Sequence, residues 1–205
     1  MSRQADASPT AVAGLLLAAG ASTRLGQPKQ LLPFAGRPLV RHVVEQALQS
    51  RLASLTVVVG FHASEVRAAI ADLPVSIIEN AAYAQGQSTS LRAGLLALPR
   101  ETAAVLVLLV DQPFVDTALI DRLIGLYEET RALIVAPVYG DRRGNPVLFD
   151  RRLIPELLTI VGDTGAREVI ARCRDHLVTL TLPDDRPFQD IDTWDDYRRL
   201  SGGSP

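Results

Sequence analysis

The stretch GLLLAAGASTRLGQPKQLL, residues 14–32, runs from an apolar segment straight into a loop that contains small residues, glycines and two cations. A short apolar run with little alternation is typical of a strand covered on both faces. Small residues directly after it let backbone N–H groups approach a base or a phosphate closely. Arg24 offers a planar fork for phosphate oxygens, and Lys29 offers a mobile point charge. The stretch therefore predicts a strand and a triphosphate-binding loop, with a surface loop of solvated cations as the alternative.

The spacing of this loop differs from three better-known motifs. A P-loop places Gly, Lys and Ser or Thr in succession, whereas Gly26 precedes Lys29 by three residues and no hydroxyl follows the lysine. The segment AAGASTRLG lacks the dinucleotide fingerprint G-x-G-x-x-G. The nearest candidate for a nucleophile elbow, GQSTS at residues 86–90, ends in serine rather than glycine. These observations disfavour P-loop NTPases, dehydrogenases and serine hydrolases.

Similar apolar runs recur along the chain and alternate with segments whose apolar residues are spaced by three and four. This alternation predicts an α/β fold with a mostly parallel sheet. After Tyr139, the segment YGDRRGNPVLF predicts a turn and a short antiparallel strand. We expect one domain over residues 11–200, with tails at 1–10 and 201–205. The expected strands are 12–17, 55–59, 75–78, 104–110, 133–136 and 177–180, and the expected helices contain 39–48, 91–98 and 119–127.

Composition narrows the class of protein. The chain has 205 residues, a net charge of -2 and a pI near 5.9, so it offers no general basic field for nucleic acid or an anionic membrane. Its one cysteine, Cys173, excludes an internal disulfide and has no metal-ligand spacing around it. The leader MSRQADASPT contains an acid and a proline, and the apolar run after it is too short to span a bilayer. We therefore expect a cytoplasmic protein.

Six ordered blocks carry a resemblance to a known family. The opening block, L-A-A-G-x-S-x-R-x-G-x-x-K-x-L-L-P followed by GRPLV, resembles the signature of nucleotidyltransferases that act on the molybdenum cofactor. Ala-Ala-Gly at residues 18–20, in place of Ala-Gly-Gly, is similar to the cytidylyl-transferring branch. The further blocks are NAAYAQGQSTSLRAGL (80–95), VDQP (110–113), RGNPVLF (143–149), GDTGAR (162–167) and DIDTWDDY (190–197).

This resemblance implies a fold and a reaction. The fold is a three-layer, Rossmann-like α/β structure of the nucleotide-diphospho-sugar transferase type. The reaction is transfer of CMP from CTP to the phosphate of molybdopterin with release of pyrophosphate, assisted by Mg²⁺. The product would pass to a recipient molybdoenzyme of the xanthine dehydrogenase type. The alternatives are GTP as donor, another phosphate acceptor such as a sugar 1-phosphate, or a non-catalytic carrier of the cofactor.

Two anionic reactants require cations and metal-binding carboxylates more than an acid and a base. Arg24, Lys29 and Asp111 are therefore the catalytic candidates. Asp111 ends the most apolar strand, where ligands bind in open α/β sheets, and we expect it to hold Mg²⁺. Capping of the next helix falls better to Asp116 or Thr117. By resemblance the nucleotide contacts are Leu17, Ala18, Ala19, Gly20, Arg24, Lys29, Gly86, Ser88 and Ser90, the last three at a helix N-terminus.

Asp190 and Asp192 form a D-x-D pair, whose carboxylates would share one face of an extended segment. The resemblance implies that one of them completes the metal site, whereas Asp192 or Thr193 can instead cap the closing helix. We favour Asp190 as the metal ligand and Asp192 as the cap.

The resemblance assigns the blocks RGNP and GDTGAR to the acceptor side. Its candidates are Gly144, Asn145, Asp163 and Arg167. We expect Asp163 to cap a helix that begins at Thr164, and Arg167 to meet the acceptor's phosphate. Turn chemistry alone is the alternative for these residues.

Overall fold

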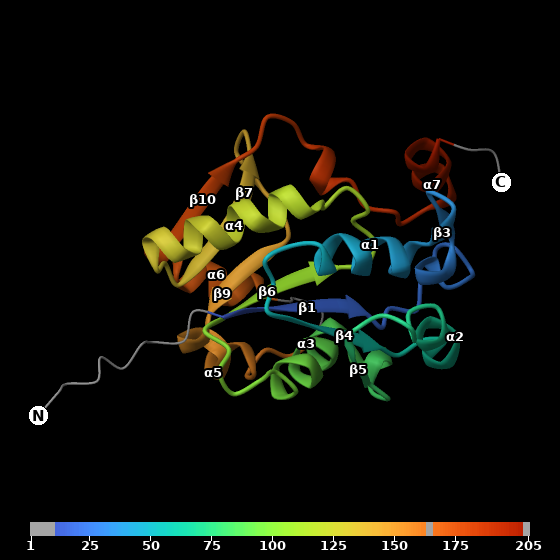
Figure 1. Cartoon of the computed structure of the whole chain (residues 1–205), viewed down its shortest axis with the longest axis horizontal. Helices are drawn as coiled ribbons and strands as arrows, with labels where there is room; N and C mark the ends of the chain where they lie inside the picture. The colour runs from blue at the N-terminus through green and yellow to red at the C-terminus, as the bar shows by residue number, and fades with distance from the viewer. Residues whose placement is uncertain (1–10, 163–165, 203–205) are drawn as a thin grey trace, which may run out of the picture.

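The sheet gives the molecule its architecture. The structure, a computed structural model, describes residues 11–162 and 166–202 (Figure 1), so the expected tail 1–10, residues 203–205 and Asp163 lie outside the described residues. Within these ranges, seven strands follow the order β10-β7-β9-β6-β1-β4-β5, and β8 pairs with β7. The strands are β1 (Val12–Ala18), β4 (Ser54–Val59), β5 (Ser76–Glu79), β6 (Ala104–Leu109), β7 (Ile134–Tyr139), β8 (Arg142–Arg143), β9 (Val147–Asp150) and β10 (Leu177–Thr181), with β2 (Pro33–Phe34) and β3 (Arg37–Pro38) forming a separate ribbon.

The sheet is mostly parallel. β1 pairs in parallel with β4 and β6, β4 with β5, and β10 with β7. β9 runs antiparallel between β6 and β7, and β8 forms an antiparallel hairpin with β7. The α/β class and the antiparallel turn expected after Tyr139 are confirmed.

Strand β1 is the centre of the core because it is buried along its whole length and hydrogen-bonded on both edges. Successive side chains point to opposite faces of a strand. Leu15 and Leu17 accordingly pack in one apolar cluster, and Leu16 and Ala18 pack in the other. Burial on both faces explains why this strand has little polar alternation.

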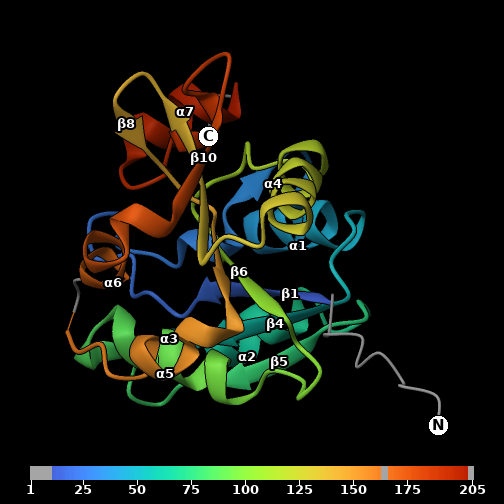
Figure 2. The ribbon, with the colours of Figure 1, turned by 90° about the vertical axis from the view of Figure 1, so that its left-hand side faces the viewer.

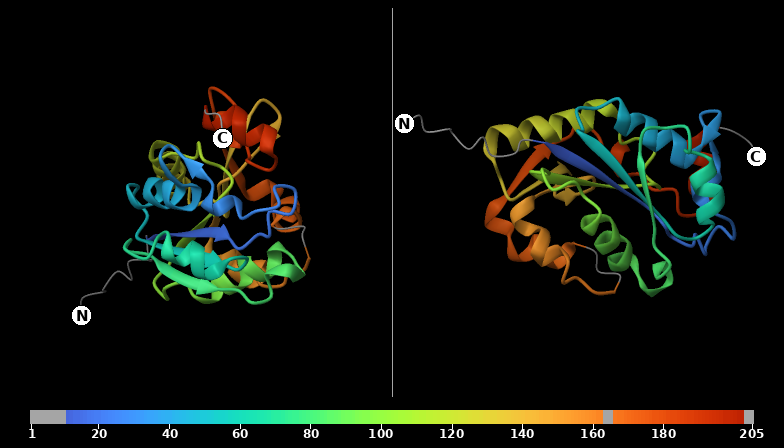
Figure 3. Two further views of the ribbon diagram at one scale, coloured as in Figure 1. Left: turned by 90° about the vertical axis from the view of Figure 1, so that its right-hand side faces the viewer. Right: turned by 60° about the horizontal axis from the view of Figure 1, so that its bottom comes forward.

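Helices cover both faces of the sheet, which makes three layers (Figures 2 and 3). α1 and α4 contribute to one apolar cluster, and α3, α5 and α6 contribute to the other. The N-cap of α4 is Asp116, whose side chain accepts a hydrogen bond from the Leu119 N–H, so the expected cap is confirmed. The helices are α1 (Leu39–Leu48), α2 (Ala63–Ala68), α3 (Gln87–Leu96), α4 (Thr117–Thr130), α5 (Ile154–Leu157), α6 (Arg167–Arg172) and α7 (Trp194–Ser201). Among the described helices, none combines the length and apolarity required to cross a membrane.

The C-terminal segment returns from β10 to the carboxyl end of β6. The backbone N–H of Ile191 donates to the Asp111 carbonyl at 2.9 Å. α7 then packs beside the β2–β3 ribbon, where the Tyr197 hydroxyl donates to the Pro33 carbonyl at 2.6 Å. This return places the last acidic residues next to the first loop.

Two helical glycines allow a test of the packing. A Cβ on Gly94 of α3 would lie 2.2 Å from a methyl carbon of Leu15, which is fully buried, whereas a Cβ on Gly125 of α4 would meet nothing closer than 4.0 Å. We expect Gly94→Ala to lower the free energy of unfolding by about 1–3 kcal/mol through overpacking. Gly125→Ala should raise it by about 0.5–1 kcal/mol through helix propensity. Urea unfolding of both variants measures the two signs, and a stabilised Gly94→Ala would contradict the close packing of α3 on β1.

Candidate functional site

A pocket opens at the carboxyl ends of β1 and β6, where ligands bind in open α/β sheets. This first pocket has a volume of about 430 Å³. It brings together segments from the start, the middle and the end of the chain. Its lining residues are Leu17, Ala19, Gly20, Ala21, Ser22, Thr23, Arg24, Lys29, Gln30, Tyr83, Ala84, Gly86, Gln87, Ser90, Leu109, Val110, Asp111 and Asp192.

The loop after β1 is held in place by Gln30, a fully buried polar residue. Its Nε2 donates to the carbonyl oxygens of Ala18 at 2.9 Å and Gly20 at 2.8 Å. The Ser22 Oγ accepts a hydrogen bond from the Lys29 backbone N–H at 3.1 Å, which closes the loop on itself. Sequence reasoning missed Gln30, because a single amide beside a lysine carries no periodic signal.

The Lys29 ammonium joins three parts of the chain. Its Nζ donates to the Asp111 Oδ2 and to the Asp192 Oδ1, both at 2.8 Å, and to the Ile191 carbonyl at 3.1 Å. Burial alone would lower the pKa of Lys29, but the carboxylates of Asp111 and Asp192 outweigh burial and raise it above its ordinary 10.5. Lys29 is therefore a fixed positive charge in this pocket.

Arg24 adds a second cation at the mouth of the pocket. Its Nη2 lies 2.9 Å from the Asp192 Oδ2, and its side chain is 67% exposed. Burial raises the pKa of Asp192, but Lys29 and Arg24 together lower it below the ordinary 3.8. Two cations and two carboxylates thus form one network on the wall of the pocket.

The two members of the D-x-D pair have different surroundings. The Asp190 Oδ1 accepts a hydrogen bond from the Gln112 Nε2 at 2.7 Å, and Asp190 does not line the first pocket. Burial, with the nearby charges of Asp111 and Asp192, raises the pKa of Asp190. The expectation that Asp192 caps α7 is wrong, because Thr193 is the cap and forms a capping box with Asp196.

The fit of a divalent cation can be judged from the carboxylates. The Asp111 Oδ1 is buried and has no hydrogen-bond partner. Among the described residues, no three His, Cys, Asp or Glu side chains are grouped to hold a metal. Mg²⁺ requires only one or two carboxylates when phosphate oxygens and waters complete its shell. Asp111 and Asp192, which meet at one ammonium, fit such a site, and Asp190 is not part of this pair.

The block at residues 80–95 contributes a second wall. Gly86 immediately precedes α3 and lines the pocket, as does Ser90, whose Oγ accepts from the Asn80 Nδ2 at 2.9 Å. Ser88 is buried and does not line the pocket, and its N–H donates to the Gly162 carbonyl. Ala18 also faces the core rather than the pocket. Tyr83 and Gln87 line the pocket but were not predicted.

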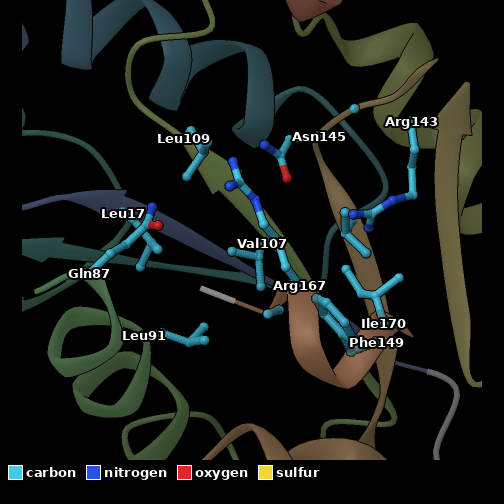
Figure 4. Close-up of a pocket in the computed structure, with 13 residues that line it drawn as sticks. Leu17, Gln87, Leu91, Val107, Leu109, Arg143, Asn145, Phe149, Arg167 and Ile170 are labelled. Atoms are coloured by element: carbon cyan, nitrogen blue, oxygen red, sulfur yellow. The ribbon is translucent and has the colours of Figure 1, made fainter. Parts of the chain in front are cut away.

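A second pocket, with a volume of about 210 Å³, lies beside the first and shares Leu17, Gln87 and Leu109 with it (Figure 4). Three expected acceptor residues, Gly144, Asn145 and Arg167, line it. Arg143 lines it too. Asp163 lies outside the described residues. The other lining residues are Leu91, Val107, Val147, Phe149, Ala166 and Ile170.

Comparison with known proteins identifies the family. Residues 14–178 match the model of the MobA-like NTP transferase domain. The chain belongs to this family. It is a nucleotidyltransferase family, as the resemblance implied.

Three relatives of this MobA-like chain span nearly its full length. It is 36% identical over 197 residues to the nicotine blue oxidoreductase of Paenarthrobacter nicotinovorans, covering 92% of this chain and 96% of that one. It is 25% identical over 189 residues to the molybdenum cofactor cytidylyltransferase of Escherichia coli K12, covering 92% and 94%. Two crystal structures of Rv0371c from Mycobacterium tuberculosis H37Rv, one a complex with manganese, are 33% and 31% identical with TM-scores of 0.85 and 0.77, each covering 95% of this chain and 100% of that one.

The role of Gln30 in this MobA-like chain can be tested by a substitution of similar volume. Gln30→Met removes both hydrogen bonds to the loop carbonyls, so we expect the free energy of unfolding to fall by about 1–3 kcal/mol. Because the loop is then less well positioned, nucleotide affinity should fall roughly tenfold. Urea unfolding and calorimetric titration measure these effects. Gln49→Met, at an exposed position, is the control, and wild-type nucleotide affinity in Gln30→Met would contradict the assignment.

In protein without metal or nucleotide, we expect Asp190 and Asp192 to have opposite effects on the pH dependence of stability. The pKa of Asp190 is raised on folding, so the stability it contributes is complete below about 3.8 and is lost as the pH rises through the folded value. Asp190→Asn should therefore be more stable than wild type at pH 7. The pKa of Asp192 is lowered, so its contribution exists above 3.8 and is lost as the pH falls, and Asp192→Asn should be less stable at pH 7. Denaturant unfolding from pH 3 to 7 measures the change in stability of each variant relative to wild type. Stability changes of the same sign at pH 7 would contradict the different surroundings of the two carboxylates.

Proposed function

We propose that residues 11–200 form a single domain that transfers CMP from CTP to the phosphate of molybdopterin, with release of pyrophosphate. One observation carries the proposal: Lys29 lies between Asp111 and Asp192, with Arg24 beside them, on the wall of a pocket large enough for a nucleotide. This set of charges suits a triphosphate. An adjoining pocket with arginines offers the acceptor a place next to it.

The cations of the first pocket would position the donor. Triphosphate and acceptor are both anionic, so bringing them together is opposed by charge repulsion. Arg24 and Lys29 provide opposite charge on a protein surface that is already organised, which is how electrostatic stabilisation contributes most to such reactions. Gly20 and the backbone around it allow close approach of the phosphates.

A divalent cation, Mg²⁺ in our proposal, would be held by Asp111 and Asp192. When bound, it would neutralise charge on the phosphate oxygens. The oxygen-only character of the two side chains suits a hard cation such as Mg²⁺ or Mn²⁺. The manganese complex of Rv0371c supports a divalent metal in this fold.

The preference for CTP rests on three observations. Residues 18–20 resemble the cytidylyl-transferring branch, and the chain matches a cytidylyltransferase over nearly all of both sequences. On the base side, the Ser90 Oγ accepts from Asn80, which leaves the Ser90 hydroxyl proton free to donate to an acceptor on the base. A recipient of the xanthine dehydrogenase type stays a prediction.

A second candidate is reduction of a planar heteroaromatic compound. The higher identity, 36%, to the nicotine blue oxidoreductase favours it. The reaction would require an external hydride donor such as a reduced nicotinamide dinucleotide. Hydride would pass to the ring, a proton would come from water, and the oxidised dinucleotide would leave.

The test is pyrophosphate release from CTP, GTP, ATP and UTP with Mg²⁺, with and without molybdopterin. We expect release only with CTP and the pterin, and a decrease in kcat of roughly 10²–10³-fold in Asp111→Asn and Lys29→Met. Asp175→Asn, an exposed carboxylate, is the control.

Each other outcome of this assay selects an alternative. Release with GTP would overturn the base preference and keep the chemistry. Turnover with a sugar 1-phosphate alone would overturn the acceptor. Cofactor binding without pyrophosphate release would indicate a carrier, and nicotinamide oxidation that depends on a heteroaromatic acceptor would indicate the reductase.

A further inference from the structure

Asn80 follows β5 directly and is only 6% exposed. Its backbone N–H donates to the Val59 carbonyl at 2.8 Å, so it continues the pairing of β5 with β4. Its side chain reaches the first turn of α3, where it contacts two consecutive hydroxyl residues, Thr89 and Ser90. Asn80 thus connects the end of a strand to a helix that contributes to the wall of the first pocket.

The hydrogen bonds around the Asn80 amide leave it only one orientation. Its Oδ1 accepts from the Ala82 backbone N–H at 3.0 Å, and a backbone N–H can only donate. The Nδ2 therefore faces the two hydroxyl groups, 2.8 Å from the Thr89 Oγ1 and 2.9 Å from the Ser90 Oγ. Because an amide nitrogen can only donate, both hydroxyl oxygens must accept from it.

The protons of these two hydroxyl groups differ in their acceptors. The Thr89 hydroxyl has the Gly86 carbonyl at 2.8 Å and the Ala82 carbonyl at 3.1 Å as acceptors. Among the residues that the structure describes, none accepts a hydrogen bond from the Ser90 hydroxyl, although Ser90 is only 4% exposed. Ser90 lines the first pocket and Thr89 does not. The Ser90 proton is therefore available to a molecule bound in that pocket.

We propose that Asn80 is a positioning residue for the nucleobase: it makes Ser90 a hydrogen-bond donor, and Ser90 donates to the ring nitrogen N3 of cytosine. The inference rests on the proposed function, which places the nucleotide in the first pocket. Asn80 does not line that pocket and acts only through Ser90.

The polarity of this hydroxyl matters because bases differ at the atom it would meet. N3 of cytosine presents a lone pair, whereas N3 of uracil and the corresponding N1 of guanine present an N–H. A hydroxyl whose oxygen is already occupied by Asn80 can bond to the first and opposes the other two. A site that leaves buried polar groups unpaired with the wrong ligand discriminates against that ligand. The O2 carbonyl is common to cytosine and uracil, so a donor to O2 would not distinguish them.

Calorimetric titration with CTP, UTP, GTP and 3-deazacytidine triphosphate, in which a C–H replaces N3, tests the atom that Ser90 contacts. The titrations contain Mg²⁺ and no acceptor, so they require no turnover. We expect wild type to bind CTP at least tenfold more tightly than the other three. Ser90→Ala should lose about tenfold in affinity for CTP and bind CTP and the deaza analogue equally. Equal affinity of wild type for CTP and the deaza analogue, or tighter binding of UTP or GTP than of CTP, would overturn the proposal.

Asn80→Asp reverses the polarity with little change in side-chain size. At pH 8 the introduced carboxylate still accepts from the Ala82 N–H, but it can also only accept from the Ser90 hydroxyl. The Ser90 proton then turns toward residue 80, and the Ser90 oxygen faces the pocket as an acceptor that suits the N3–H of uracil. We expect the ratio of CTP affinity to UTP affinity to fall at least tenfold.

Asn80→Ala is a second variant of the same residue. Without a fixed donor the Ser90 hydroxyl can rotate, so the ratio of CTP affinity to UTP affinity should lie between those of wild type and Asn80→Asp. A wild-type ratio in whichever of the two variants folds, as checked by urea unfolding, would overturn the role of Asn80.

Thr89→Val is the matched control, because it removes the other hydrogen bond of the Asn80 Nδ2 and keeps a branched side chain. The free energy of unfolding should fall in both Thr89→Val and Ser90→Ala, since each removes a partner of Asn80. The ratio of CTP affinity to UTP affinity should change only in Ser90→Ala. A change of similar size in Thr89→Val would indicate a general structural effect of this network and contradict the assignment.

The failure of this inference and the failure of the proposed function are distinguishable. Selection of CTP through Ser90 without pyrophosphate release would reject the function and keep the role of Asn80 and Ser90. Pyrophosphate release from CTP with molybdopterin, with the same ratio of CTP affinity to UTP affinity in Ser90→Ala as in wild type, would keep the function and reject the inference.

Discussion

The ammonium of Lys29 is the contact on which the site depends. It reaches Asp111, 82 residues along the chain, and Asp192, 163 residues along. Together with the hydrogen bond from the Ile191 N–H to the Asp111 carbonyl, it fixes the returning C-terminal segment to the end of β6. Removing charges from water is costly, and a partly buried ion pair recovers that cost only with good geometry. Three short contacts to one ammonium provide that geometry.

The same network explains how a pocket with charges of both signs can receive a highly charged ligand. Lys29 and Arg24 balance Asp111 and Asp192, so the free protein holds no unpaired charge within this group. A triphosphate and a divalent cation bring charges of both signs to the same place. If the cationic side chains exchange carboxylates for phosphates and the carboxylates exchange ammonium and guanidinium groups for the metal, each protein group stays beside an opposite charge. Binding then costs little of the electrostatic stabilisation of the free protein.

The fold could be predicted from the sequence because buried strands have a local signature. Each expected strand lies within two residues of an observed one, except the end of β7, which continues to Tyr139. The site could be predicted less completely. Arg24, Lys29 and Asp111 stand out as charges next to an apolar strand or a glycine loop. Gln30, Tyr83 and Arg143 do not, since their positions depend on contacts between segments distant in the sequence.

The D-x-D pair illustrates the physical limit of local rules. Alternation places residues i and i+2 on one face only in a regular strand, and the segment around Ile191 is not one. Gln112 donates to Asp190 while Lys29 donates to Asp192, so the two carboxylates have different partners. The N-cap of α7 could have been predicted from the sequence alone, because Thr193 and Asp196 have the spacing of a capping box.

The activities in the names of the two relatives, an oxidoreductase and a cytidylyltransferase, require different features of the two pockets. The second pocket, lined by Arg143, Arg167, Gln87, Asn145 and apolar side chains, does not by itself distinguish between the two activities. Only nucleotidyl transfer requires paired cations and carboxylates beside a glycine-containing loop. Sequence identity weighs every residue equally, whereas the reaction depends on the few that touch the reacting groups. Because Arg24, Lys29, Asp111 and Asp192 converge on one wall, the first pocket argues for nucleotidyl transfer despite the higher identity to the oxidoreductase.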